Sequence, residues 1–156
     1  MLPIIPIAPP RIPMSEKPLP HLKRPPQTEP DWFEALMSLA RYLRGPEGCP
    51  WDRVQGSVEF AGFLKGEAEE LVEAAKAANN PHLAEEFGDT LFTLLATAAA
   101  AEAEGRFQLI DALRAAHEKM IRRHEHVFGD AKARTPEDAV RVWNEVKRRE
   151  RETGHK

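Results

Sequence analysis

Residues 57–104, SVEFAGFLKGEAEELVEAAKAANNPHLAEEFGDTLFTLLATAAAAEAE, decide the fold. Ala, Leu and Glu dominate this stretch, β-branched residues are sparse, and no alternation of period two occurs, which is typical of helices. Asn79-Asn80-Pro81 interrupts the pattern and predicts two helices, over residues 57–78 and 82–104. Ser57 is expected to cap the first. Because the connection is short, we expect the two helices to pack antiparallel.

The remainder of the chain predicts further helices and no strands, so the fold class is all-α. The additional helices are expected over residues 30–43, 109–124 and 136–152. Thr28, followed three residues later by Asp31, is a capping pattern, and Thr135 is the expected N-cap of the last helix. Residues 45–52 are expected to form a loop. Gly105 is expected to end the helix predicted over residues 82–104. Together, these helices predict a bundle of four to five helices.

Composition divides the chain and limits its class. Ten of the 14 prolines lie in residues 1–30, so we interpret residues 1–27 as a proline-rich flexible tail and residues 28–156 as a single domain. The net charge of −3 argues against a nucleic-acid binder. No run of eighteen apolar residues occurs, which predicts no membrane span. The single cysteine, Cys49, fits a reducing compartment and thus a cytoplasmic protein.

Glutamates crowd the helix predicted over residues 57–78, and they divide between two faces. At 100° per residue, one face is apolar and consists of Phe60, Phe63, Leu64, Leu71, Ala74 and Ala78. Glu67 and Glu70 fall inside this face. Glu69 and Glu73 fall on the opposite side, each three or four residues from a lysine, as in ordinary solvated ion pairs. Two of the four glutamates therefore need another explanation.

The following helix repeats this feature. Glu86 and Asp89 are spaced i,i+3 on an otherwise largely apolar helix, so an antiparallel pair can direct four carboxylates to one place. Left unpaired there, the carboxylates would repel one another and resist desolvation, at a cost of several kcal/mol each in principle. Oxygen-only ligands suit Mg²⁺ or Mn²⁺, so a divalent cation site is one interpretation. The alternative is a solvated acidic surface.

Several motifs carry a resemblance to a known family. Glu67-x-x-Glu70 is followed after fifteen residues by Glu86-x-x-Asp89. The other motifs are GPEGCPWD (45–52), Gln55, EEFGD (85–89), EGRF (104–107), KMIRRHEHVF (119–128) and WNEVK (143–147). In order and spacing, residues 31–152 resemble the MazG family of nucleoside triphosphate pyrophosphohydrolases.

This resemblance implies an activity and a site. It implies Mg²⁺-dependent hydrolysis of NTPs or dNTPs to the nucleoside monophosphate and pyrophosphate, as in the removal of unwanted nucleotides. Its metal-binding and catalytic residues would be Glu67, Glu70, Glu86 and Asp89, and its substrate-binding residues would be Lys119, Arg123, Trp143 and Lys147. Because so short a chain is not expected to cover its apolar helices alone, the bundle is expected to be completed by a homodimer.

Other interpretations remain open. Glu70-x-x-Glu73 satisfies a loose form of the same metal signature. The activity is alternatively that of a narrower dUTP or dCTP pyrophosphatase, or the chain is a non-catalytic helical interaction module. The cations near residue 123 also suit a helix C-terminus, and Trp143 also suits a core position. His124 and His126 are expected to point apart rather than to share a metal.

Overall fold

The computed structural model describes residues 19–77 and 80–154 of the chain. These residues form seven helices and no strand, which confirms the predicted all-α class. Most of the predicted tail, residues 1–18, lies outside the described residues. The contacts divide the chain into two compact units, Met1–Arg106 and Phe107–Lys156, and each is described by itself. Among the described residues, no helix is long and apolar enough to span a bilayer.

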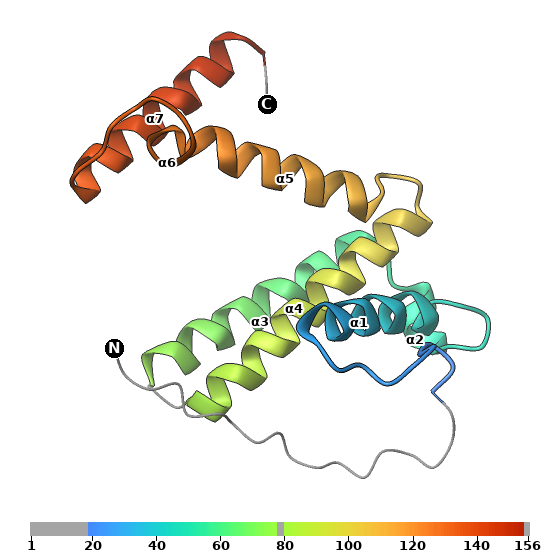
Figure 1. Ribbon diagram of the computed structural model, residues 1–156. Coiled ribbons are helices and arrows are strands. Elements are labelled where there is room, and N and C mark those ends of the chain that lie inside the picture. The colour runs from blue at the N-terminus through green and yellow to red at the C-terminus, as the bar shows by residue number, and fades with distance from the viewer. Residues whose placement is uncertain (1–18, 78–79, 155–156) are drawn as a thin grey trace. The chain divides into compact units, whose positions relative to one another are not determined.

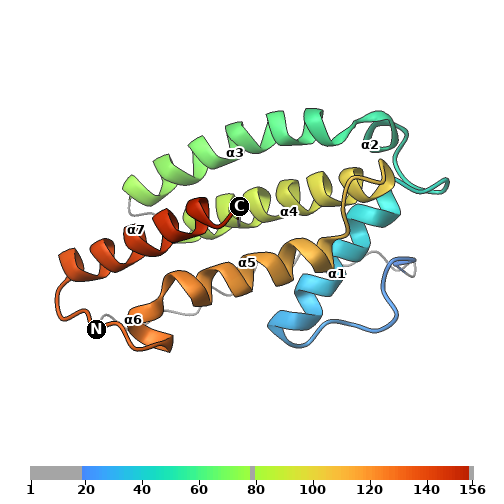
Figure 2. The same ribbon diagram turned by 90° about the horizontal axis from the view of Figure 1, so that it is seen from above.

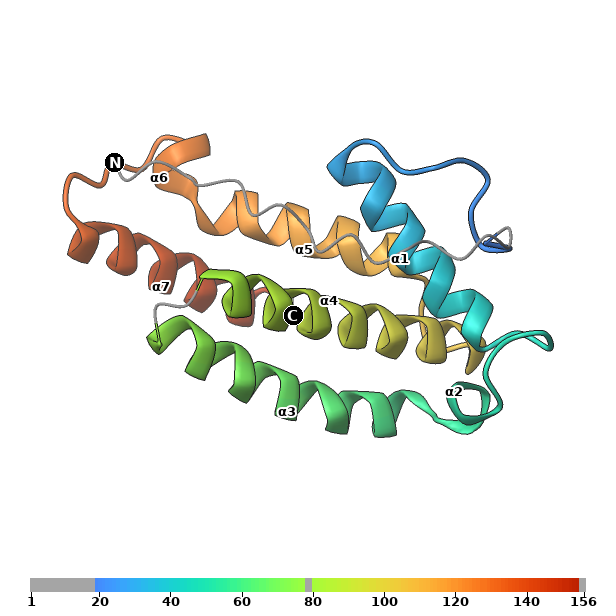
Figure 3. The ribbon, with the colours of Figure 1, turned by 90° about the horizontal axis from the view of Figure 1, so that it is seen from below.

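The first unit is built around two long antiparallel helices (Figure 2). Its elements are α1 (Glu29–Leu43), α2 (Pro50–Val54), α3 (Ser57–Lys76) and α4 (Asn80–Ala103). Helix α1 packs across α4, which therefore has a helix on two sides (Figure 3). The small side chains of Ala96 and Ala100 are buried against Phe60 of α3, and small side chains allow helix axes to approach closely. The alanine-rich end of α4 is thus the centre of this core.

Helix α1 begins where the sequence predicts. Thr28 is the N-cap: its Oγ1 accepts from the Asp31 N–H at 3.3 Å, and an Asp31 carboxylate oxygen accepts from the Thr28 N–H at 3.0 Å. The capping box is therefore confirmed. The end of α1 is tied to α4 by the Arg41 guanidinium, whose Nε and Nη2 each donate to Glu102 at 2.9 Å.

The predicted loop over residues 45–52 is wrong in its second half. Pro50 begins the short helix α2, where its missing N–H and fixed φ are no disadvantage. Gly48 approaches the end of α1 closely, since a Cβ there would lie 2.3 Å from the Tyr42 carbonyl oxygen. The connection between α1 and α3 is therefore a compact turn and helix, and it demands glycine at residue 48.

The predicted N-cap of α3 is also wrong. Gly56, not Ser57, is the N-cap, and it has no side chain to satisfy the first N–H groups. The Glu104 carboxylate takes this role from beyond the end of α4, because it accepts from the Ser57 N–H and from the Ser57 Oγ, both at 2.6 Å. An anion at a helix N-terminus is also favoured by the helix dipole.

Gly105 makes this arrangement possible. It has φ of 68°, a left-handed conformation that costs a residue with a Cβ about 1–2 kcal/mol. The Arg106 N–H donates to the Ala101 carbonyl and the Gly105 N–H to that of Glu102, which is the Schellman pattern. The predicted helix stop at Gly105 is confirmed, and the reversal it produces leaves Glu104 beside the start of α3.

The second unit contains two longer helices and a single short turn of helix (Figure 1). Its elements are α5 (Leu109–Arg123), α6 (Glu125–Phe128) and α7 (Pro136–Glu152). The α7 start is confirmed, since Thr135 Oγ1 accepts from the Asp138 N–H at 3.2 Å. Two α7 residues, Val146 and Glu150, are buried.

The region of His124 differs from the expectation. Helix α5 ends at Arg123, and His124 has φ of −97° and ψ of 45°, which is not helical. The rings of His124 and His126 therefore do not diverge: their centroids lie 5.7 Å apart. The expectation that they point apart is wrong because it assumed a continuous helix.

The contact between Glu104 and α3 makes a stability prediction. Hydrogen bonds from the Ser57 side chain and then the Ser57 backbone hold the pKa of Glu104 below its ordinary value. The stabilisation is therefore present above that ordinary value and is lost as the pH falls through the lower folded pKa. We expect Glu104→Gln to lower the Tm by a few degrees at pH 7, and the deficit to vanish in strong acid.

The measurement is thermal unfolding followed by circular dichroism across acidic pH, with Glu34→Gln as the control. Glu34 is exposed on α1. An equal loss in both variants, or a loss that persists unchanged in strong acid, would contradict the assignment.

Candidate metal centre

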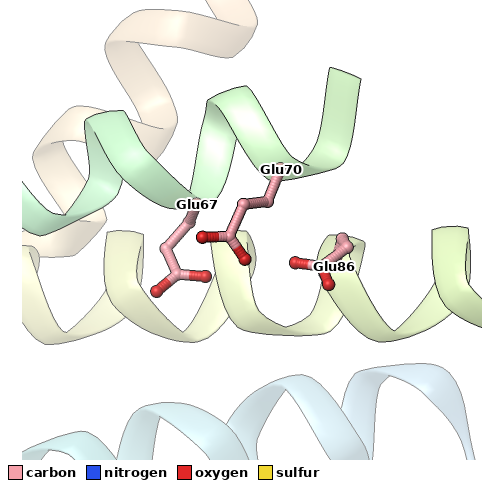
Figure 4. Close-up of side chains that lie close together, drawn as sticks. All are labelled: Glu67, Glu70 and Glu86. Atoms are coloured by element: carbon pink, nitrogen blue, oxygen red, sulfur yellow. The ribbon is translucent and has the colours of Figure 1, made fainter. Parts of the chain in front are cut away.

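Three carboxylates converge between α3 and α4 (Figure 4). Glu67 and Glu70 come from α3 and Glu86 from α4, and one oxygen of each lies within 4.8 Å of the others. We call these three side chains the carboxylate cluster. The structure thus brings together three of the four residues that the sequence predicts for a metal site.

The cluster follows from the local geometry of the two helices. Glu67 and Glu70 are three residues apart and so project from the same side of α3. The neighbouring turn of α4 is fixed to α3 there, because the Thr90 hydroxyl donates to the Glu67 carbonyl oxygen at 3.2 Å. Glu86 lies one turn earlier on α4 than Thr90, and it therefore faces the two α3 glutamates.

The three carboxylates differ in their exposure to solvent. Glu86 is buried, with 6% of its surface exposed, Glu67 is half-buried and Glu70 is exposed. A surface hollow of about 680 Å³ opens beside the cluster, and its lining includes Glu70, Glu86 and His82. The cluster is therefore closed on the side of the helix pair and open on the other.

The electrostatics of the cluster are unfavourable without a cation. Burial, followed by the charges of Asp89, Glu70 and Glu86, raises the pKa of Glu67. Glu86 Oε1 lies 3.3 Å from the His82 Nδ1, whereas its Oε2 is buried and accepts no hydrogen bond from any described residue. A buried carboxylate oxygen without a donor is costly, so this atom is suited to ligate a cation.

The lysines on α3 form ion pairs with glutamates outside the carboxylate cluster. Lys76 lies 2.8 Å from Glu73, and Lys65 lies 3.9 Å from Glu69, and all four side chains are exposed. Glu73, which belongs to the competing form of the signature, is thus engaged in a surface ion pair. The geometry groups Glu67, rather than Glu73, with the remaining carboxylates.

Asp89, the fourth predicted ligand, is not one of the three members of the cluster. Its side chain is exposed and is not one of the three whose oxygens lie within 4.8 Å of one another. Its charge still contributes to the raised pKa of Glu67, so it lies near the cluster. Its role as a ligand stays a prediction.

The predicted substrate-binding residues all lie in the second unit. Lys119 and Arg123 are on α5, and Trp143 and Lys147 are on α7. Lys119 and Lys147 are half-buried and make no ion pair with any described residue. The Arg123 guanidinium stacks over the Trp143 ring, with 5.4 Å from its Cζ to the ring centroid. Phosphate binding by these residues stays a prediction.

The sequence reasoning missed Glu150, which pairs with Arg123 through Nε and Nη2 at 3.0 and 2.9 Å. Its position carried a signal, because Trp143, Val146 and Glu150 follow the i,i+3,i+7 spacing of a buried helix face. An acid at such a position is as unusual as those at residues 67 and 70. The many charged residues at neighbouring positions of α7 made Glu150 look like one more exposed acid.

The fold and the cluster define an all-α protein with an oxygen-only candidate metal site between two antiparallel helices. Residues 55–128 match the model of the MazG nucleotide pyrophosphohydrolase domain. The crystal structure of a mazG-related protein from Thermotoga maritima is similar, with a TM-score of 0.63 and 31% identity, covering 74% of this chain and 98% of that one. The chain belongs to the MazG family, whose members are hydrolases acting on pyrophosphate bonds.

Longer relatives are similar over the same region. The chain is 40% identical over 119 residues to the nucleoside triphosphate pyrophosphohydrolase/pyrophosphatase MazG of T. maritima, which covers 76% of this chain and 45% of that protein. It is 35% identical over 120 residues to the nucleoside triphosphate pyrophosphohydrolase of Escherichia coli K12, covering 76% and 46%. The chain thus spans less than half the length of these curated relatives.

The raised pKa of Glu67 makes a prediction about stability. A carboxyl whose folded pKa is raised favours folding below its ordinary pKa, and this contribution is lost as the pH rises through the folded value. At pH 7 and without metal, Glu67 is therefore destabilising. We expect Glu67→Gln to raise the Tm of the metal-free protein by a few degrees and to weaken the further rise that Mg²⁺ produces.

The measurement is a thermal melt in EDTA and in a Mg²⁺ series. Glu73→Gln serves as the control, since Glu73 pairs with Lys76 on the exposed side of α3. A metal-free Tm that falls in Glu67→Gln, or Mg²⁺ stabilisation of equal size in wild type and Glu67→Gln, would refute the prediction.

Proposed function

We propose that this protein hydrolyses nucleoside triphosphates to the monophosphate and pyrophosphate, with Mg²⁺ bound by Glu67, Glu70, Glu86 and Asp89. The observation that carries the proposal is the buried Glu86 oxygen without a hydrogen-bond donor, in a cluster of three carboxylates. Membership of the MazG family supports the reaction type. Removal of unwanted nucleotides, in the reducing cytoplasm that suits the lone Cys49, is the role we infer.

The residues present fit a hard divalent cation. All the donors are carboxylate oxygens, which suit Mg²⁺ or Mn²⁺ and do not select a softer metal. Bound there, Mg²⁺ would neutralise phosphate oxygens and lower the pKa of the attacking water. Buried Glu86 would provide the most fixed ligand, while exposed Glu70 faces the hollow from which substrate would enter.

A proton acceptor is also needed, because hydrolysis removes a proton from the attacking water. We assign this role to a carboxylate oxygen of the cluster that the bound Mg²⁺ leaves uncoordinated. The half-buried position of Glu67 would limit competition by bulk solvent at that side chain.

The triphosphate requires cations in addition to the metal. Lys119, Arg123 and Lys147 are the residues that the family resemblance proposes, with Trp143 near the nucleotide. Lysine acts as a point charge, whereas the planar guanidinium of Arg123 can bind two phosphate oxygens at once. The three cations and the indole all lie on α5 and α7, the two longer helices of the second unit.

A homodimer is the assembly that we propose. Phe87 and Leu94 of α4 are 60% and 50% exposed, and α5 has no buried residue along its described length. Exposed apolar side chains in such numbers are typical of surfaces that bind another protein. A second copy of the chain, packing helix against helix, would cover them.

The proposed activity is tested by pyrophosphate release from each NTP and dNTP, with and without Mg²⁺. We expect release only with the metal, and we expect Glu86→Gln to reduce it by roughly 100-fold or more, since this isosteric change removes a ligand charge. Glu34→Gln is the control, because Glu34 is exposed on α1 and does not line the hollow. Activity confined to dUTP or dCTP would indicate the narrower enzyme.

The non-catalytic alternative has a clear outcome in the same assay. If Glu86→Gln and wild type release pyrophosphate at equal rates, or if neither does so with any nucleotide, the catalytic assignment is wrong.

The assembly is tested by size-exclusion chromatography with light scattering at micromolar concentration. We expect twice the chain mass of 17.6 kDa. A single species at the mass of one chain would refute the homodimer.

A further inference from the structure

A buried carboxylate in the second unit has no part in the site described above. Glu150 lies on α7 with 9% of its surface exposed. Burial raises the pKa of Glu150, but the hydrogen bonds and charges of Arg123 and Arg122 outweigh this and hold the pKa below its ordinary value. The group is therefore charged at neutral pH, and the chain has placed an anion inside a small helical unit.

The two carboxylate oxygens of Glu150 make different contacts. Glu150 Oε2 accepts from both Nε and Nη2 of Arg123, at 3.0 and 2.9 Å. The other oxygen, Oε1, is buried and accepts no hydrogen bond from a described residue, and the Arg122 Nη2 is 3.4 Å away. The short charge-assisted contacts are therefore made by one oxygen with one guanidinium.

A second contact fixes the plane of this guanidinium. The Arg123 Cζ lies 5.4 Å from the centroid of the Trp143 ring, within the range of a cation–π contact. The Trp143 ring in turn meets the His124 ring edge to face, at 5.1 Å. Trp143 and Glu150 are seven residues apart, two turns along the same side of α7. Two α7 side chains thus hold a single α5 side chain, one at its edge and one at its face.

The hydrogen bonds leave part of the guanidinium available. An arginine has five N–H donors, and the Glu150 contacts use the Nε–H and one N–H on Nη2. The three remaining donors have no acceptor among the described residues, and the side chain keeps 21% of its surface exposed. Two of these donors are on Nη1, so the guanidinium retains the donors needed for phosphate oxygens.

We propose that Glu150 is a positioning residue that orders Arg123, against Trp143, for the phosphates of the substrate. The inference rests on the proposed function, in which Arg123 contacts the triphosphate. A free arginine loses considerable side-chain entropy when it binds. A guanidinium that is already fixed loses less, so preorganisation by Glu150 increases affinity without any contact between Glu150 and the nucleotide.

A buried ion pair can also be structural alone, and the two roles make different predictions. A structural role makes the effect of changing Glu150 appear in thermal stability, while nucleotide binding by the folded protein stays unchanged. A positioning role makes the effect on nucleotide binding depend on Arg123. A double-mutant cycle separates these cases.

The experiment measures binding of the Mg²⁺ complex of α,β-methylene ATP by calorimetry, and KM and kcat by pyrophosphate release. The full-length chain is used as wild type, Glu150→Gln, Arg123→Met and the double variant. We expect Glu150→Gln to weaken binding and raise KM about tenfold, with kcat changed less than about threefold, because the amide oxygen lacks the negative charge that holds the guanidinium. In the Arg123→Met background, the same change should have no further effect on binding.

Glu145→Gln is the matched control. Glu145 is on the same helix and pairs with an arginine, with 2.6 Å to Arg148, but this pair is exposed. The control should leave both affinity and KM unchanged. Thermal melts of each variant verify folding at the assay temperature, and Glu150→Asp, which keeps the charge on a shorter side chain, should restore part of the affinity if Glu150→Gln proves unstable.

The outcomes of this cycle are distinct from those of the activity assay. Equal losses of binding from Glu150→Gln with and without Arg123, or unchanged binding in a folded Glu150→Gln, would overturn the positioning role. Coupled losses of binding in a chain that releases no pyrophosphate would support this inference and overturn the proposed function. Pyrophosphate release without coupling would overturn this inference alone.

Discussion

The packing of α3 against α4 is the constraint on which the first unit depends. Small alanine side chains let the helices approach closely around Phe60, and the Thr90 hydroxyl fixes one turn of α4 to the α3 backbone. The same contact brings Glu86 to the two α3 glutamates. Glu104 closes the opposite end of the pair by replacing the cap that Gly56 lacks. The core and the candidate metal centre are therefore two consequences of one helix–helix interface.

This interface is not arranged for maximum stability. Burial and the charges of Asp89, Glu70 and Glu86 raise the pKa of Glu67, and a buried oxygen of Glu86 has no donor among the described residues. A chain selected only for stability would replace such groups with apolar side chains. Their presence between the two helices that form the core of this unit is the physical reason to propose a cation there.

The second unit also contains a buried carboxylate, but there it is paired with a positive charge. Glu150 is buried, but the positive charge of Arg123 compensates its negative charge. The buried carboxylate here holds a guanidinium in place, whereas the first unit has a cluster of carboxylates. Both units thus contain buried charge on a helix face that is otherwise apolar. In the first unit the Oε2 atom of Glu86 has no donor among the described residues, whereas in the second Arg123 pairs with Glu150 and retains unused donors. This difference agrees with the separate roles proposed above, metal binding for the first unit and phosphate binding for the second.

The sequence by itself determined the all-α class, the starts of α1 and α7, the helix stop at Gly105 and the projection of Glu67 and Glu70 from one side of α3. These features depend on the local spacing of residues and on caps within a few residues of a helix end, and both can be read from the sequence. The tertiary structure alone decided the rest. Glu104 caps α3 from 47 residues away, the rings of His124 and His126 lie close together, Asp89 is exposed, and Glu150 holds Arg123 from 27 residues away. Such contacts join positions that no periodic pattern connects, because they depend on how the helices pack.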